Sequence, residues 1–201
     1  MAEKEDNNTE QRILDAAEQV FLRDGLAGAR MQDIANVANI NKALLHYYFR
    51  TKDKLFEMIF RAKMNELMPK LSSYAAQDAT LLEVFDHFID TYIAILQRNP
   101  YMPMFVLSTI SRNPDFVKNV STDLGQVLVA RFEKEIAAGQ IRPVHPHQFM
   151  MSLMGMCLFP YVGKPMFKQV FNIEEATYKE LLADRQRHIK TYIHAILGTE
   201  L

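Results

Sequence analysis

The sequence contains one cysteine and no long uninterrupted apolar segment. Cys157 has no second thiol with which to form an intramolecular disulfide, as is usual in a reducing compartment. The first residues, MAEKEDNNTEQ, are polar and acidic and contain no apolar stretch of the signal-peptide type. The most apolar stretch, residues 149–162, is interrupted by Ser152, Gly155 and Pro160 and is shorter than the ~20 residues that span a bilayer. We therefore expect a cytoplasmic protein that does not associate with a membrane.

Excess charge of one sign is also lacking. The 201 residues have a formal net charge of −1, so binding to nucleic acid would have to come from local charge rather than from the overall field. The composition, 49% hydrophobic and 23% charged, is that of an ordinary globular protein. A chain of this length has room for one large domain, or for a small module joined to a larger one. The sequence shows no glycine-rich phosphate loop, no hairpin signal and no internal repeat.

Apolar residues recur at helical spacing along nearly the whole chain, which predicts an all-α fold. Thr9 is expected to cap the first helix, and Gly25 to end it. Thr51 is expected to cap a fourth helix that ends near Pro69. We expect residues 1–8 to be a disordered lead-in, residues 9–56 a small helical module, and residues 57–201 a larger helical body.

Residues 30–49 have the pattern of two short helices joined by a tight turn. Ala35 and Ala38 are small enough to let the helices cross closely. Asn39 tolerates a positive φ, Ile40 can fill the gap between the helices, and Asn41 can cap the second helix. Such a helix-turn-helix can present its second helix to the DNA major groove.

Positive charge is concentrated beside this motif. Residues 41–63 contain six basic and two acidic residues, a local excess of four positive charges in a chain whose total is −1. Three consecutive aromatic residues, Tyr47, Tyr48 and Phe49, lie within this basic segment. The segment therefore suits a nucleic-acid surface, whereas the alternative is that the basic residues only solvate a helix face.

The segment from Gly25 to Leu55 resembles the DNA-binding module of the TetR family of bacterial regulators. The resemblance rests on Ile34-Ala35, on residues 38–41 (ANIN), on residues 42–49 (KALLHYYF), and on Lys52 and Leu55, all in register without a gap. Asn39 replaces the usual turn glycine, and Ala29-Arg30 replaces a Thr/Ser pair whose hydroxyls would cap the first of the two helices. Ala43 replaces a glycine, and His46 replaces a tyrosine that commonly faces the DNA backbone.

The resemblance implies roles in DNA contact for particular side chains. These are Arg30, Asn41, Lys42, Ala43, Leu44, His46, Tyr47 and Lys52. Lys42 and Lys52 are expected to meet phosphates, which set register and affinity without reading sequence. Ala43, Leu44 and Tyr47 are better placed to touch base edges or thymine methyl groups. Leu45, Tyr48 and Phe49 follow the buried stripe and are interpreted as core.

Ten methionines follow the helix-turn-helix, interleaved with aromatic residues. Methionine is flexible and polarizable and suits an apolar surface that must adapt to its partner. In a TetR-like body such residues would line a pocket for a small apolar ligand, although an ordinary methionine-rich core is the alternative. The candidate pocket residues are Met64, Phe88, Tyr92, Met102, Phe105, Met151, Met154, Cys157 and Tyr161. The break at residues 159–165 could be a pocket rim or a simple corner between helices.

Two apolar helices near the C-terminus could pair with a second copy of the chain, as TetR-like proteins do. The candidate dimer residues are Met150, Leu158, Leu182, Ile189, Tyr192, Ile193 and Ile196. A two-fold homodimer would match a palindromic operator. The alternative is that both helices pack only within their own chain.

The resemblance therefore implies a sequence-specific transcriptional regulator that binds double-stranded DNA. The expected form is a repressor released from its operator by a small apolar effector. A TetR-like protein controlled by a protein partner, or one that organises DNA without an effector, is the alternative. We expect no enzyme, no cofactor and no metal site, because Cys157 lacks a catalytic partner and the pair His145 and His147 lacks a further ligand.

Overall fold

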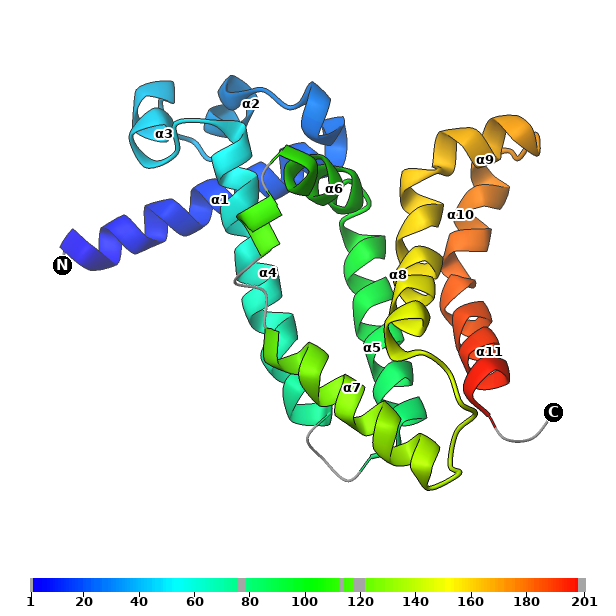
Figure 1. Ribbon diagram of the computed structural model, residues 1–201. Helices are drawn as coiled ribbons and strands as arrows, with labels where there is room; N and C mark the ends of the chain where they lie inside the picture. The colour runs from blue at the N-terminus through cyan, green and yellow to red at the C-terminus, as the bar shows by residue number, and fades with distance from the viewer. Residues whose placement is uncertain (1, 76–78, 113, 118–121, 199–201) are drawn as a thin grey trace. The chain divides into compact units, whose positions relative to one another are not determined.

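The computed structural model describes residues 2–75, 79–112, 114–117 and 122–198, and it is helical throughout, with no β-strand in these ranges (Figure 1). The prediction of an all-α fold is confirmed. The helices are α1 (Ala2–Gly28), α2 (Met31–Val37), α3 (Lys42–Tyr48), α4 (Lys52–Ala75), α5 (Leu81–Arg98), α6 (Met102–Arg112), the 3-10 helix η1 (Pro114–Val117), α7 (Thr122–Ala137), α8 (Pro146–Val162), α9 (Lys164–Val170), α10 (Glu175–Ala183) and α11 (Arg185–Leu197). None of the described helices is both long and apolar enough to cross a membrane.

The chain divides into two compact units, Met1–Glu66 and Leu67–Leu201. The boundary falls inside α4, later than the expected division between residues 56 and 57. Two expected helix limits were wrong. Helix α1 begins at Ala2, so residues 2–8 are helical rather than a disordered lead-in, and Thr9 lies within the helix. Helix α4 continues through Pro69 to Ala75.

The first unit packs three helices and the beginning of α4 around a small core. Helix α1 contacts α2, and α2 contacts α3. Ile13 and Phe21 of α1, Ile34 of α2 and Leu45 of α3 are fully buried. The ring of Phe21 lies 5.9 Å from that of Phe56 in α4. Gly25 has a φ of 67°, a left-handed conformation that glycine adopts without strain, and it kinks the chain inside α1, three residues before that helix ends at Gly28.

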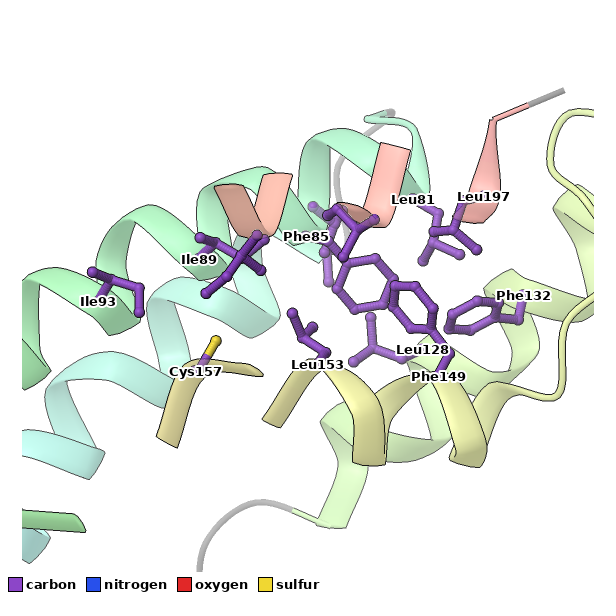
Figure 2. Close-up of a cluster of buried hydrophobic side chains, with 14 of the residues drawn as sticks. Leu81, Phe85, Ile89, Ile93, Leu128, Phe132, Phe149, Leu153, Cys157 and Leu197 are labelled. Carbon is purple, nitrogen blue, oxygen red and sulfur yellow. The ribbon is translucent and has the colours of Figure 1, made fainter. Parts of the chain in front are cut away.

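The second unit is built around α5, whose apolar face lies against α7, α8 and α11 (Figure 2). Phe85 of α5, Phe132 of α7 and Phe149 of α8 form a cluster with ring centroids 4.8–5.6 Å apart. Such ring arrangements add to the stability that burial alone provides. Thr80 begins α5 with a capping box, in which its hydroxyl accepts from the Glu83 N–H while the Glu83 carboxylate accepts from the Thr80 N–H.

The C-terminal part of the second unit is a helical hairpin with a short extra helix. Pro160 lies inside α8, and the chain bends only at Gly163, where α9 begins. The Pro160 carbonyl accepts a hydrogen bond from the Tyr178 hydroxyl at 2.6 Å, which joins α8 to α10. Helices α10 and α11 follow one another closely and meet at Asp184, which is the C-cap of the first and the N-cap of the second.

Candidate functional site

The turn between α2 and α3 has the geometry that its sequence predicts. Asn39 adopts a φ of 54°, in the left-handed region that asparagine tolerates. Its N–H donates to the Asn36 carbonyl at 3.1 Å, and the Ile40 N–H donates to the Ala35 carbonyl at 3.0 Å. These bonds close the end of α2 and direct the chain into α3. The expected helix-turn-helix is therefore present.

Helix α3 is capped at its start and divided into a buried and an exposed side. Asn41 is its N-cap, and the side-chain oxygen accepts from the Leu44 N–H at 2.7 Å. Leu45 and Phe49 are buried as predicted, whereas Tyr48 is half-buried. The predicted contact residues Lys42, Ala43, Leu44, His46 and Tyr47 are all exposed. Tyr47 has 80% of its surface exposed, an unusual position for a tyrosine that serves only packing.

The beginning of α2 differs from that of α3, because no side chain caps it. Arg30 occupies the N-cap position and makes no side-chain capping bond, as expected where a hydroxyl has been replaced. Its side chain is exposed, while the neighbouring Ala29 is buried. Arg30 is therefore free to act through its charge.

Most of the basic residues that follow α3 are already paired. Lys54 and Arg61 both bind Glu57, at 2.7 and 3.0 Å. The hydrogen bond from Lys54 is the main reason why the pKa of Glu57 lies below its ordinary value. Lys63 binds Glu18 of α1 at 2.6 Å. The Lys63–Glu18 pair joins α4 to α1, whereas Lys54, Glu57 and Arg61 are paired within α4.

Three cations of the first unit lie close to the helix-turn-helix in sequence and are exposed. They are Arg30, Lys42 and Arg50, and within the described part of the chain none of their side chains has a hydrogen-bond or ion-pair partner. Sequence reasoning counted Arg50 in the basic segment but did not assign it a contact. Arg50 directly follows Phe49, the C-cap of α3, and this position is the signal that could have identified Arg50 as a candidate contact residue.

Lys52 makes contacts within its own unit. Its ammonium group lies 3.3 Å from the carbonyl oxygens of both Ala27 and Ala29, at the junction of α1 and α2. The side chain is half-buried. The expected phosphate contact of Lys52 stays a prediction.

The predicted pocket residues fall into three groups. Met64 is buried and belongs to the first unit, whereas the other candidates belong to the second. Met102, Phe105, Cys157 and Tyr161 are buried in the second unit, whereas Phe88, Tyr92 and Met154 are half-buried there. Met151 is 66% exposed on α8, so its assignment to an interior pocket was wrong.

The side chains around Cys157 are largely apolar, and the nearby Arg185 guanidinium, which donates to the Met156 carbonyl at 3.1 Å, lowers the pKa of the Cys157 thiol in opposition to burial. The rings of Phe88 and Tyr92 stack at 5.2 Å on α5, and both pack against the core that contains Cys157. Burial raises the pKa of Cys157 and of Tyr161 to about 12 each, and it also raises the pKa of Tyr92. All three groups are therefore neutral at physiological pH. The Tyr161 hydroxyl is buried and has no hydrogen-bond partner among the residues that the structure describes.

The predicted dimer residues are divided between two sides of α8 and α11. Ile189 and Ile193 have no exposed surface because they belong to the core of their own chain, so their assignment to an interface was wrong. Met150, Leu158 and Leu182 are half-buried against the same core. Tyr192 and Ile196 are exposed, as an interface requires.

Sequence reasoning missed three other exposed apolar residues, Met151 and Phe159 of α8 and Leu181 of α10. Together with Tyr192 and Ile196 they form what we call the α8–α11 apolar face. A cavity of about 280 Å³ lies beside it, lined by residues that include Pro160, Tyr178 and Tyr192. Pro160 therefore lies at a cavity wall, consistent with the pocket-rim interpretation of residues 159–165.

Residues 13–59 match the family described as bacterial regulatory proteins, tetR family. The HTH-type transcriptional repressor NicS of Pseudomonas putida is 29% identical over 149 residues, which cover 69% of this chain and 62% of NicS. The HTH-type transcriptional repressor SCO4008 of Streptomyces coelicolor is 40% identical over 67 residues, 33% of this chain and 35% of that repressor. The matches thus cover less than two thirds of either relative.

The fold is similar to that of solved regulators. A crystal structure of a putative transcriptional regulator from Saccharomonospora viridis, in complex with choline, has a TM-score of 0.73 to this chain. The two share 16% identity, and the superposition covers 95% of this chain and 98% of the other. At this level of identity the similarity concerns the fold alone.

Proposed function

We propose that this chain, a member of the TetR family of bacterial regulatory proteins, is a homodimeric repressor. A small apolar ligand would release it from a palindromic operator. The observation that carries the proposal is the exposed side of α3. This side presents Ala43, Leu44, His46 and Tyr47 to solvent, while Leu45 and Phe49 fix the helix from behind. An exposed, capped second helix is the element that a helix-turn-helix inserts into the major groove.

The side chains divide by chemistry into two kinds of DNA contact. Arg30, Lys42 and Arg50 are exposed cations and would bind phosphates. Ala43, Leu44 and Tyr47 would meet base edges and thymine methyl groups in the groove. Asn41 and His46, at the two ends of α3, would contact the sugar-phosphate backbone.

The α8–α11 apolar face supports the proposed dimer. Met151, Phe159, Tyr192 and Ile196 expose large apolar side chains on a protein whose remaining exposed apolar residues are distributed over other helices. A second copy would bury this face by a two-fold operation, which places the same residues on both sides of the interface. The operator would then consist of two half-sites ~34–36 Å apart, or a multiple of that distance.

The largely apolar region around Cys157 supports an effector that is itself largely apolar. A charged ligand group buried beside Tyr92, Cys157 and Tyr161 would lose its hydration without gaining an opposite charge from them. The partnerless Tyr161 hydroxyl can bind one polar atom of the ligand. The choline complex of the Saccharomonospora viridis regulator shows that a protein of this fold binds a small molecule.

Selection of bound sequences from randomised duplex DNA by the purified protein at physiological salt tests the proposal. Recovery of one palindrome is the expected result, and that DNA then serves as the probe for a screen of largely apolar ligands. Recovery of no motif, with weak binding that disappears as salt rises, would contradict sequence-specific recognition.

A further inference from the structure

The cavity of about 280 Å³ beside the α8–α11 apolar face is lined by residues of α8, α9, α10 and α11. These helices follow one another along the chain, and α8 contacts both α9 and α11 (Figure 1). The wall is mostly apolar and includes Pro160, Phe167 and Ile173. Cys157 and Tyr161 are not among the described residues that line it, so the cavity is distinct from the region proposed for the effector. Its volume lies just below the range of about 300–1,000 Å³ that suits drug-sized ligands, so a smaller molecule fits.

The cavity wall contains one cation without an acidic partner, Arg185. It is the first residue of α11 and is half-buried, and its Nε–H donates to the Met156 carbonyl of α8 at 3.1 Å. Within the described ranges the guanidinium makes no other hydrogen bond and no ion pair. Burial raises the pKa of the Tyr178 hydroxyl and the charge of Arg185 opposes that shift, so the guanidinium lies close to this part of the wall. The N–H groups on its two terminal nitrogens are left for a ligand.

Other basic side chains near the cavity are already paired with carboxylates. His188, which also lines the cavity, lies 3.1 Å from the Asp184 carboxylate. The two lysines of α9 both bind Glu175 of α10, at 2.5 and 2.7 Å. Arg185 is therefore the lining cation whose charge the described residues leave without an opposite charge.

We propose that this cavity binds a small monocarboxylate with an apolar body, and that Arg185 binds its carboxylate. A planar guanidinium can donate two parallel hydrogen bonds to a carboxylate, and such charge-assisted bonds are stronger than neutral ones. The apolar body would be buried against Phe167 and Tyr192. The Tyr178 hydroxyl already donates to the Pro160 carbonyl at 2.6 Å, which holds α10 against α8 at the cavity wall. This site goes beyond the proposed function and does not depend on DNA binding.

A second copy of the chain is the alternative occupant, because Leu181 and Tyr192 belong both to the cavity wall and to the α8–α11 apolar face. The charge of Arg185 argues against it. An apolar side chain of a partner would remove water from the guanidinium and supply no opposite charge, which is costly. A carboxylate supplies that charge, so the cavity suits a small anion better than an apolar side chain.

Isothermal titration calorimetry of the wild-type protein at pH 7 would compare benzoate and octanoate with benzamide and octanamide, which have the same apolar bodies and no charge. Each carboxylate is expected to bind at least about tenfold more tightly than its amide. Arg185→Gln keeps a side-chain N–H donor but removes the charge, so it should lose this preference. Lys179→Gln removes an exposed charge of α10 that does not line the cavity, so it should keep the preference.

Three results would each overturn the proposal: equal affinity for acid and amide, undiminished carboxylate binding by folded Arg185→Gln, and no binding at millimolar carboxylate. Binding by the Met151→Glu variant alone would also overturn it, because a second copy would then cover the cavity in the wild type. None of these titrations contains DNA, so their outcome is independent of operator selection.

Fluorescence locates the bound carboxylate, since the sequence contains no tryptophan. Leu181→Trp places one at an exposed residue of the cavity wall, and Leu22→Trp places one at an exposed residue of the first unit. Benzoate is expected to change the emission of Leu181→Trp with the Kd found by calorimetry and to leave that of Leu22→Trp unchanged. An unchanged emission of Leu181→Trp while benzoate binds would place the carboxylate elsewhere and overturn the assignment.

Discussion

Glu135 of α7 accepts hydrogen bonds from the Leu81 N–H with both carboxylate oxygens, at 2.9 and 3.1 Å. The carboxylate is buried and lies 3.5 Å from the Arg131 guanidinium. Leu81 is the first residue of α5. The contact therefore supplies an acceptor for one of the N–H groups that a helix leaves unpaired at its start, and it joins α5 to α7.

Glu135→Ala is expected to lower the free energy of unfolding by about 2–4 kcal/mol, because it leaves the buried Leu81 N–H and the Arg131 charge without this partner. Glu133→Ala removes an exposed carboxylate from the same helix and is expected to change stability by less than about 0.5 kcal/mol. Urea denaturation of both variants measures the difference. Equal stability of the two variants would show that the Glu135 contact contributes nothing.

Tyr161 and Tyr178 provide a matched pair for hydroxyl deletion. The Tyr178 hydroxyl donates to the Pro160 carbonyl at 2.6 Å, so Tyr178→Phe is expected to cost about 1 kcal/mol. The Tyr161 hydroxyl has no partner, so Tyr161→Phe is expected to leave the stability of the free protein unchanged or to raise it. Thermal unfolding checks both. Destabilisation by Tyr161→Phe would mean that its hydroxyl already has a partner in the free protein.

Glu175 gives a stability contribution that depends on pH. Hydrogen bonds from Lys164 and Lys168 hold its pKa at about 2, below the ordinary value of 4.5. Since the folded state lowers this pKa, the contribution is complete above pH 4.5 and disappears as the pH falls towards 2. The Tm of Glu175→Gln is thus expected to lie below that of the wild type at pH 6 and to converge with it near pH 2. A Tm difference independent of pH would contradict this.

The α8–α11 apolar face predicts a variant that is monomeric but folded. Met151→Glu places a charge at the most exposed apolar position of α8, where a dimer would have to bury it without a partner. We expect sedimentation velocity to show a dimer for the wild type and a monomer for Met151→Glu. Leu22→Glu, at an exposed apolar residue of the first unit, should remain dimeric. A dimeric Met151→Glu protein would place the interface elsewhere.

Local chemistry made the helix-turn-helix predictable from the sequence. The positive φ of Asn39 and the capping bond of Asn41 depend on residues within a few positions, and both are as expected. The burial of Leu45 and Phe49 follows from helical spacing, which fixes one side of α3.

Features that depend on distant residues were not predictable in this way. The contacts of Lys52 with Ala27 and Ala29 bring together residues more than twenty positions apart. The helical spacing of apolar residues could not decide which of the adjacent residues Tyr192 and Ile193 of α11 faces the core of the chain, because both belong to one apolar stripe. The continuation of α4 through Pro69 shows that one proline did not suffice to predict the end of this helix.

The most direct test of sequence reading by α3 is operator selection with the Tyr47→Ala variant beside the wild type. Tyr47 is the most exposed aromatic residue of α3, and its ring lies edge-on to that of Tyr48 with 5.5 Å between the centroids. If α3 reads bases in a symmetric dimer, the wild type will select a palindrome. The variant will then select the same palindrome with preference lost at one corresponding position in each half-site. An identical motif for both proteins would show that Tyr47 does not read sequence. A non-palindromic wild-type motif, in which the variant loses base preference at only one position, would contradict the symmetric dimer.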